Sequence, residues 1–225
     1  MTRAAPRRPS VVLFDVFETL VQLEPLRERF VEAGRPGHEL ELFFARTLRD
    51  GMAYTLAGDA PPFRTIAAAQ LAITSGHTLS DNAIAHILDG FADLPLHPEA
   101  ETAFTLLAEA DVPAYGFTHG GAGVLESILD RHGSSGKVRG VLSTEALHSF
   151  KPPARVYHWA CEQAGAAPGD TALVAVHSWD THGAVKAGLL AGFASRLEGG
   201  LTPLAERPHV VANRVDEVVA GLLAL

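Results

Sequence analysis

Cysteine is almost absent from this sequence: Cys161 is the only one in 225 residues. A single cysteine excludes an internal disulfide and any cysteine-rich zinc site. Such cysteine usage is typical of a reducing compartment, so we expect a cytoplasmic protein. Long apolar runs are missing as well. No stretch approaches the roughly 18 apolar residues that a spanning helix needs, and a membrane protein is therefore not expected.

Positive charge is scarce. The chain has 18 Lys and Arg against 26 Asp and Glu, which gives a net charge of −8. A surface of that sign repels phosphate backbones, so we expect no nucleic-acid partner. The apolar stretch after the first arginines is cut by Asp15 and Glu18, unlike a signal peptide. Residues 1–9 are expected to form a solvated tail.

What the chain does have is a hydrophobic fraction of 47%, enough for the core of one α/β domain with an insertion. Residues 11–14 form a short apolar run, as expected for a strand buried on both faces. From residue 96 onward, strand and helix patterns alternate. That alternation is typical of a parallel sheet with helices on both faces.

The segment from residue 22 to residue 95 has a different pattern, with no strand signal. Helices are predicted there at residues 39–57, 63–75 and 80–93, with Ser80 as an N-cap. Further strands are expected at residues 112–117, 138–142, 171–176, 192–196 and 209–212. We therefore predict an α/β fold: a doubly wound, Rossmann-like parallel sheet (residues 1–21 and 96–225) with an inserted helical cap (residues 22–95).

Four polar residues follow or face the ends of the predicted strands: Asp15, Thr118, Lys151 and Asp180. Ligands of open parallel sheets bind outside the carboxyl ends of the strands. Taken singly, each residue has an ordinary interpretation, since a loop aspartate is commonly a solvated turn or a helix cap and a lysine before proline is usually surface. Four of them converging on one edge indicates a site, with the Asp15 carboxylate as a candidate nucleophile.

These positions fall within four short motifs. Residues 15–20 (Asp-Val-Phe-Glu-Thr-Leu) resemble the first motif of the haloacid dehalogenase (HAD) superfamily, and residues 118–120 (Thr-His-Gly) resemble the second. Residues 151–152 (Lys-Pro) resemble the third motif, and residues 177–180 (His-Ser-Trp-Asp) the fourth. The motifs are spread over almost the whole chain. The resemblance implies the HAD core fold with a cap between the first two motifs.

Two positions separate the chemistries within this superfamily. Its phosphatases have a second aspartate two residues after the nucleophile and an acid four residues before the last aspartate; here these are Phe17 and Val176. Neither can support a metal ion, and an uncompensated phosphate would be repelled by ionised Asp15. We therefore expect no metal and no cofactor. The chain instead resembles the type II L-2-haloacid dehalogenases, whose motifs contain an aromatic residue at Phe17, a Trp-Asp pair at Trp179 and Asp180, and a tyrosine at Tyr157.

That resemblance implies a metal-independent hydrolytic dehalogenase of short 2-haloalkanoic acids. Asp15, ionised at neutral pH, would attack the halogen-bearing carbon, expel halide and form an aspartyl ester. Water would then attack the ester carbonyl and release a 2-hydroxy acid of inverted configuration. A small 2-haloacid is the expected partner, and the resemblance also implies a homodimer.

Each candidate residue has an expected role. Lys151 would hold Asp15 ionised and aligned, Thr19 and Thr118 would donate hydroxyl hydrogen bonds, and Asp180 would orient Lys151 and polarise water. Phe17 would form a dry wall beside the nucleophile. The expected catalytic residues are Asp15, Thr19, Lys151 and Asp180. The expected substrate- or halide-binding residues are Phe17, Arg46, Thr118, His119, Tyr157, His177 and Trp179.

Three positions depart from the family pattern. Members carry a halide-binding arginine about thirty residues after the nucleophile, and Arg46 fits that spacing. An alternative register places Phe44 there, with Arg46 or Arg49 as a shifted substitute. His119 stands where asparagine is usual, and it can still donate a hydrogen bond, more strongly if protonated. His177 also replaces an asparagine, either positioning water or serving as an ordinary loop histidine.

Two other functions stay open at this point. One is a HAD-like phosphatase with an unusual metal site, and the other is a catalytically silent relative that binds a small carboxylate or a protein. Residues 118–123 are glycine-rich and precede a predicted helix, so they could cradle the carboxylate of a substrate on backbone N–H groups. They lack the spacing of a dinucleotide-binding loop.

Overall fold

A six-stranded parallel sheet forms the centre of the protein, in a computed structural model that describes residues 7–225. Its strand order is β3-β2-β1-β4-β5-β6, and every pair of neighbours is parallel. The strands are β1 (Val11–Phe14), β2 (Ala114–Thr118), β3 (Gly140–Ser143), β4 (Thr171–Ala175), β5 (Leu190–Ala194) and β6 (Val210–Ala212). The predicted doubly wound sheet is confirmed.

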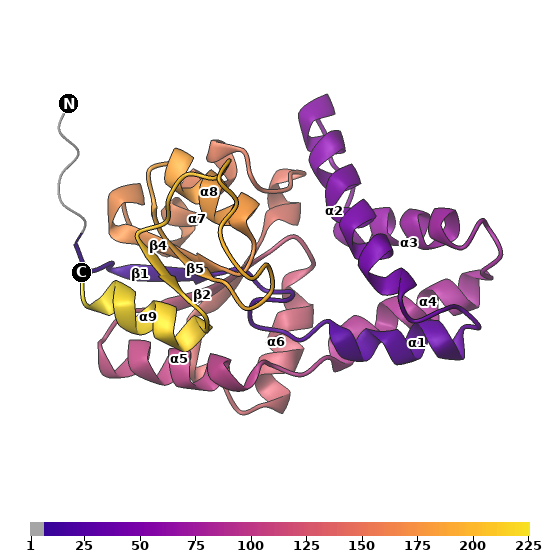
Figure 1. Ribbon diagram of the computed structural model, residues 1–225, viewed down its shortest axis with the longest axis horizontal. Helices are drawn as coiled ribbons and strands as arrows, with labels where there is room; N and C mark the ends of the chain where they lie inside the picture. Colours follow the sequence, from indigo (N-terminus) through magenta and orange to yellow (C-terminus); the bar gives the residue numbers. More distant parts are fainter. Residues whose placement is uncertain (1–6) are drawn as a thin grey trace.

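Helices cover both faces of this sheet (Figure 1). One face carries α5 (Pro98–Glu109), α6 (Ala122–Arg131) and α9 (Val215–Leu223), and the other carries α7 (Ala154–Ala164) and α8 (Ser178–Lys186). The alternation of side chains along β1 explains this division. Phe14 points into the first layer and meets Phe104 edge-on, whereas Leu13 belongs to the cluster around Phe117 and Tyr157. The short 3₁₀ helices of this part are η3 (Ser135–Lys137), η4 (Thr144–Leu147) and η5 (Pro168–Asp170).

A separate group of helices, here called the helical lobe (residues 24–93), lies beside the sheet lobe, which comprises the other described residues (Figure 1). Its helices are α1 (Arg27–Glu32), α2 (Glu39–Ala57), α3 (Phe63–Thr74) and α4 (Asp81–Asp89), with the 3₁₀ helices η1 (Glu24–Leu26) and η2 (Gly90–Asp93). The chain passes between the lobes twice, and the two passages pair through a bridge between Val21 and Leu96. The division of the chain into domains at residues 21–22 and 95–96 stays a prediction that this arrangement supports.

The two lobes also touch at a second place, near the carboxyl end of α2. The Thr55 hydroxyl accepts a hydrogen bond of 2.8 Å from the backbone N–H of Phe150. One turn earlier, Gly51 lies against the Phe150 ring, so that a Cβ atom there would be 2.3 Å from a ring carbon. Only a glycine permits this approach, and it holds α2 against the loop that leads to Lys151.

Several elements differ from the prediction. The six-residue helix α1 was not predicted, and the predicted helix at 80–93 ends at Asp89 before continuing as η2. The Ser80 cap is confirmed, since its hydroxyl accepts from the N–H of Ala83. Of the described residues in the expected solvated tail at residues 1–9, Arg7 and Arg8 are exposed, although Arg7 also pairs with Asp170, and Pro9 is buried. The rest of that tail, residues 1–6, lies outside the described residues. Among residues 7–225, no helix is long and apolar enough to cross a membrane.

Candidate active site

Asp15 follows β1 directly, in the middle of the sheet, where its backbone N–H donates to the carbonyl of Val174 on β4. Its carboxylate is held from both sides. Oδ1 accepts a hydrogen bond of 2.8 Å from Lys151, and Oδ2 accepts one of 2.7 Å from the Thr19 hydroxyl. Thr19 in turn accepts from the N–H of Val176, which fixes the direction of its own proton. The nucleophile predicted from sequence is therefore rigidly oriented.

Lys151 lies between two carboxylates and has no solvent exposure. Besides Asp15, its ammonium donates to Asp180 Oδ2 at 2.5 Å and to the carbonyl of Phe117 at 3.3 Å, which uses all three protons. The other oxygen of Asp180 accepts from the Tyr157 hydroxyl at 2.7 Å. Two buried carboxylates thus share one buried cation, and each polar atom of the trio has a partner.

The protonation states of Asp15 and Lys151 follow from the charged groups that lie close to each of them. Burial alone would raise the pKa of the Asp15 carboxyl, but Lys151 and His177 outweigh it and hold that pKa far below its usual range. Burial alone would lower the pKa of Lys151, but Asp15 and Asp180 raise it above the ordinary value. Asp15 is consequently a carboxylate, and Lys151 an ammonium ion, at neutral pH.

His177 bridges Asp15 and a second carboxylate that the sequence interpretation did not assign. Its Nδ1 lies 3.1 Å from Asp15 Oδ2, and its Nε2 lies 2.9 Å from Glu18 Oε2. Because carboxylates only accept hydrogen bonds, both ring nitrogens carry protons. Burial would lower the pKa of His177, but the hydrogen bonds to Asp15 and Glu18 raise it to about 10. In this arrangement His177 is an imidazolium ion.

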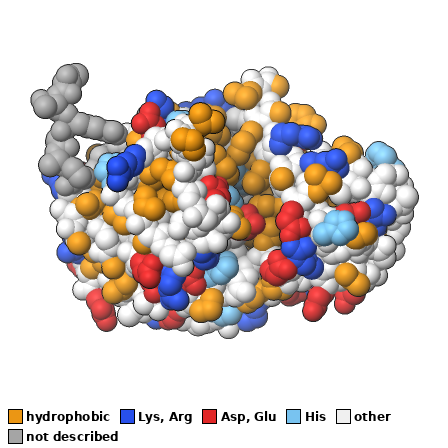
Figure 2. All heavy atoms as spheres, in the orientation of Figure 1, with side chains coloured by type: hydrophobic (Ala, Val, Ile, Leu, Met, Phe, Trp, Pro, Cys, Tyr) orange, Lys and Arg blue, Asp and Glu red, His pale blue; other side chains and the backbone are white. Residues whose placement is uncertain are grey.

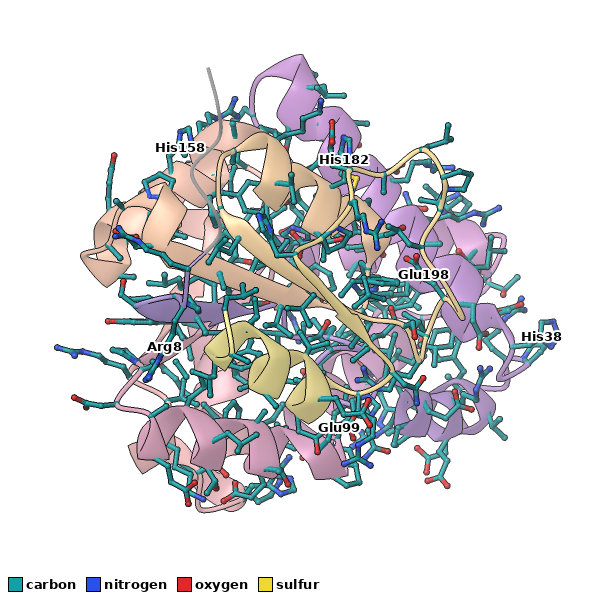
Figure 3. The ribbon with its side chains drawn as sticks, turned by 60° about the vertical axis from the view of Figure 1, so that its left-hand side comes forward. Arg8, His38, Glu99, His158, His182 and Glu198 are labelled. Atoms are coloured by element: carbon teal, nitrogen blue, oxygen red, sulfur yellow. The ribbon has the colours of Figure 1, made fainter. Side chains whose placement is uncertain are left out.

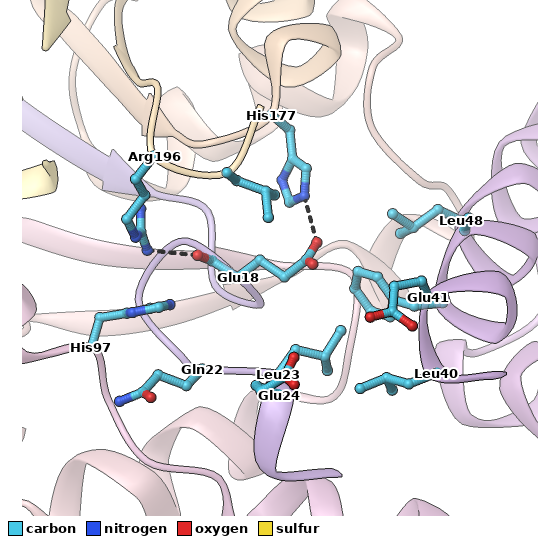
Figure 4. Close-up of a pocket in the computed structure, with 13 residues that line it drawn as sticks. Glu18, Gln22, Leu23, Glu24, Leu40, Glu41, Leu48, His97, His177 and Arg196 are labelled. Carbon is cyan, nitrogen blue, oxygen red and sulfur yellow. Dashed lines mark hydrogen bonds and ion pairs between the residues drawn. The ribbon is translucent and has the colours of Figure 1, made fainter. Parts of the chain in front are cut away.

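Glu18 reaches His177 because its backbone adopts the left-handed conformation, with φ of 65°. A residue other than glycine adopts that conformation at a cost of about 1–2 kcal/mol, so other contacts must hold it. Arg196 supplies them, since its guanidinium donates to the carbonyl oxygen of Glu18 at 2.6 Å (Figure 4) and to that of Thr19 at 2.8 Å. Arg196 is itself paired at 3.1 Å with Glu99 of α5, whose position Figure 3 shows.

His119 also lines the cavity at Asp15. Its Nε2 accepts a hydrogen bond of 3.0 Å from the backbone N–H of Lys151, and its ring packs on Phe150 at 4.4 Å. Burial and then the charge of Lys151 lower the pKa of His119 well below its usual value. The ring is thus neutral and keeps its proton on Nδ1, and the stronger, protonated donor considered from sequence is not present.

Four phenylalanine rings cluster beside the site, and three of them, Phe17, Phe44 and Phe63, line the cavity at Asp15. Phe17 packs against three others, with ring centroids 5.1 Å from Phe91, 5.9 Å from Phe63 and 6.4 Å from Phe44. Phe17 belongs to the sheet lobe, whereas its three partners come from α2, α3 and η2 of the helical lobe. The two lobes therefore both contribute aromatic rings to the surface around Asp15.

A small cavity lies at Asp15, and larger ones adjoin it. The cavity at Asp15 measures about 10 Å³ and is lined by Asp15, Phe17, Phe44, Leu48, Phe63, Thr118, His119, His177 and Trp179. A larger one of about 440 Å³ opens between the lobes and shares His177, Phe44 and Leu48 with the first (Figure 4). Figure 2 shows the surface hollowed between the lobes, with acidic and apolar side chains around the hollow. The small cavity holds about one water molecule, so this arrangement is closed.

Most of the predicted site residues are brought together at one place: Asp15, Phe17, Thr19, Thr118, His119, Lys151, His177, Trp179 and Asp180. The Thr118 hydroxyl accepts from the N–H of Gly120 rather than contacting Asp15. Tyr157 is wholly buried behind Asp180 and does not line the cavity. Because its hydroxyl donates to Asp180, Tyr157 holds that carboxylate in place and does not contact the substrate.

The structure does not bring Arg46 to the site. Its guanidinium donates to Thr74 of α3, and Arg49 pairs with neighbouring Asp50. Phe44 lies at the cavity in their place, as the alternative register of α2 predicts. The two candidate positions are two residues apart, about 200° around a helix, so only one of them can face the nucleophile.

Sequence reasoning missed Glu18, Arg196, Leu48 and Phe63. An ionisable side chain inside the first motif was a usable signal for Glu18. The other three lie far from any motif, and only the packing of the lobes reveals them. Within residues 7–225, no group of three or more His, Cys, Asp or Glu side chains is placed to hold a metal ion.

The fold is of the HAD type, as its sheet order, its helical lobe and the carboxylate–lysine–carboxylate trio indicate. Comparison with known proteins supports the resemblance to the type II L-2-haloacid dehalogenases. No family model matches the sequence. A curated relative, the (S)-2-haloacid dehalogenase 4A of Burkholderia cepacia, is 26% identical over 102 residues. That match covers 45% of this chain and 44% of that protein, less than half of its length.

Solved structures match over nearly the whole chain. The L-2-haloacid dehalogenase of Xanthobacter autotrophicus, with chloropropionic acid covalently bound, superimposes with a TM-score of 0.84 at 20% identity, covering 94% of this chain and 97% of that one. A further L-2-haloacid dehalogenase gives a TM-score of 0.88 at 22% identity, covering 98% of this chain and all of the other. The chain thus has the fold of the L-2-haloacid dehalogenases.

Proposed function

We propose that this protein is a metal-independent hydrolase that cleaves the carbon–halogen bond of short 2-haloalkanoic acids, with Asp15 as the nucleophile. One observation carries the proposal: a buried Asp15 carboxylate paired with Lys151 at 2.8 Å beside the aromatic side chain of Phe17. A carboxylate held in this way can attack carbon. The likeness to (S)- and L-2-haloacid dehalogenases supports carbon as its target.

In the first step, an Asp15 oxygen displaces the halide in line and forms an ester. The phenylalanine rings keep water from the carboxylate, which leaves its lone pairs free for the substrate. Lys151 cannot move away, since it is wholly buried, and it keeps Asp15 ionised until the new bond forms. The N–H at Nδ1 of neutral His119 is a hydrogen-bond donor for the substrate carboxylate or the departing halide.

In the second step, water attacks the ester carbonyl carbon of Asp15 and releases the 2-hydroxy acid. Because the substrate carbon is attacked only once, its configuration is inverted. The closed cavity at Asp15 accommodates only small groups, so the helical lobe must move for a substrate to reach the nucleophile. The resemblance further suggests a cytoplasmic homodimer. Sedimentation of the purified protein would test the dimer.

Halide release tests this proposal directly. The wild type should liberate halide from chloroacetate, fluoroacetate or 2-chloropropionate without added metal, and Asp15→Asn should release none. In ¹⁸O-water, a single turnover should label the Asp15 side chain. An absence of halide from every small 2-haloacid would refute the assignment. Turnover of p-nitrophenyl phosphate that requires Mg²⁺ would instead support the phosphatase alternative.

A further inference from the structure

His177 and Glu18 extend from the nucleophile as a carboxylate–histidine–carboxylate chain, and neither of them bonds to the substrate in the first chemical step. An ester on Asp15 still has to be hydrolysed, and water at neutral pH attacks an ester slowly without a base. A base must lie within reach of a water molecule that faces the carbonyl carbon.

We propose that His177 is the general base that activates this water and that Glu18 is the positioning residue that orients it, an inference that rests on the proposed function. The geometry supports this role, since Nδ1 lies 3.1 Å from Asp15 Oδ2 and both residues line the small cavity, which has room for about one water molecule. Nε2 is bound to Glu18 at 2.9 Å, which leaves Nδ1 as the nitrogen that exchanges protons.

Ester formation itself converts His177 from acid to base. While Asp15 is ionised, His177 faces two carboxylates and stays protonated, with a pKa of about 10. Alkylation removes the charge of Asp15 and leaves only Glu18, so the pKa of His177 falls and its Nδ1 proton passes to solvent through the adjoining cavity. The base is therefore absent until the ester that requires it has formed.

Every proton in the hydrolysis is accounted for. Neutral His177 takes one proton from water while the hydroxide adds to the Asp15 carbonyl carbon. The tetrahedral intermediate then breaks its bond to the substrate oxygen, which leaves with the remaining proton of the water as a hydroxy acid. Asp15 is again a carboxylate and His177 again an imidazolium ion. The complete cycle consumes one water and releases one halide and one proton.

Asp180 is less suited to this step. Its two carboxylate oxygens already accept hydrogen bonds from Lys151 and Tyr157, and its side chain has no exposed surface. His177, by contrast, lines both the cavity at Asp15 and the larger cavity between the lobes. The strained backbone of Glu18, held by Arg196, is explained if the Glu18 carboxylate must stay at Nε2.

The experiment compares the wild type with His177→Ala and Glu18→Gln during reaction with 2-chloropropionate, following halide release and the mass of the peptide that contains Asp15. His177→Ala should release about one equivalent of halide and then slow by roughly 10²–10⁴-fold, with the ester retained on Asp15. Glu18→Gln should accumulate the same ester with a smaller loss. Added imidazole should speed ester hydrolysis in His177→Ala, an effect that a purely structural role would not produce.

Glu109→Gln, on the exposed end of α5, is the control and should behave as the wild type does. Continued turnover of His177→Ala and Glu18→Gln without any ester on Asp15 would overturn the assignment of the base while leaving the dehalogenase proposal intact. A complete lack of halide and of Asp15 adduct in the wild type would overturn both.

Discussion

At the scale of single residues, charge is arranged so that no ion of the site lacks a counterion. Asp15 contacts both Lys151 and His177, and His177 contacts Glu18 in addition. Removing one member takes a counterion from each buried neighbour, and a buried charge that loses its partner costs far more than the pair contributes when intact. The stability of the fold and the protonation of the site are therefore linked, and pH reveals that linkage.

His177 gives the clearest pH prediction. Its pKa is raised from an ordinary 6.5 to about 10 in the folded protein. The stabilisation from its protonation is thus complete below pH 6.5 and is lost as pH rises through about 10. The free energy of unfolding of the wild type, relative to His177→Asn, should fall over that interval by a few kcal/mol, since a tenfold change in proton affinity corresponds to about 1.4 kcal/mol. Urea unfolding at pH 6, 8 and 10 measures it.

His38→Asn serves as the control, since His38 is exposed at the tip of the helical lobe (Figure 3). It should leave the pH dependence of the wild type unchanged. A difference between wild type and His177→Asn that increases with pH would contradict the bridging role of His177.

At the scale of elements, α8 is the helix on which the buried end of the site depends. Gly183 of α8 lies against Tyr157 of α7, and a Cβ at this position would be 2.4 Å from the Tyr157 hydroxyl oxygen. Gly183→Ala should therefore push that hydroxyl away from Asp180 and lower both stability and turnover. Tyr157→Phe removes the closest of the three overlapping atoms and leaves Pro152 Cβ at 2.7 Å and the ring carbon Cζ at 2.9 Å, so the alanine should cost less stability in that background but still some. A double-mutant cycle by urea unfolding tests this coupling, and strictly additive losses would contradict it.

Elements with a clear hydrophobic pattern, either an unbroken apolar run or a helical period, were predictable from the sequence. Residues 11–14 and 171–176 read as buried strands because every position is apolar or small, and α2 and α3 show a clear helical period. The helix α1 was missed because its six residues are too few to display a period. β5 begins at Leu190, two residues before the predicted start, because α8 ends at Lys186.

The residues of the candidate site likewise divide into those that the sequence could predict and those that it could not. Asp15, Lys151 and Asp180 follow or face strand ends, so the topology of a parallel sheet brings them together and motifs suffice to find them. The side chains from the helical lobe depend on the rotation of α2 about its axis, which the spacing from Asp15 does not determine. That is why Arg46 was expected at the cavity and Phe44 occupies it.

At the scale of the whole molecule, the contact between α2 and the loop before Lys151 couples the two lobes. Gly51→Ala would drive a Cβ into the Phe150 ring and force α2 from the sheet lobe. Overpacking of this kind typically costs about 1–3 kcal/mol. The variant should unfold at lower urea concentration than the wild type. Trp179, which lines the cavity, should also become more accessible to acrylamide, measured in a Trp159→Phe background.

A matched control is Gly123→Ala in α6, where a Cβ meets no atom within 4 Å. Alanine in a helix is intrinsically favoured over glycine by roughly 0.5–1 kcal/mol, so this variant should not be destabilised. Equal losses in the two variants would show that the close packing on Phe150 does not hold the lobes together.

The position of β1 has a consequence for how the protein is made. The strand that leads into Asp15 pairs with β2 and β4, about 100 and 160 residues further along the chain. During synthesis, the helical lobe can pack through contacts near in sequence, whereas Val11–Phe14 stays without its second neighbour until residue 175 has left the ribosome. For most of translation this fully apolar strand is an exposed edge, and we expect chaperone binding to nascent chains to concentrate there.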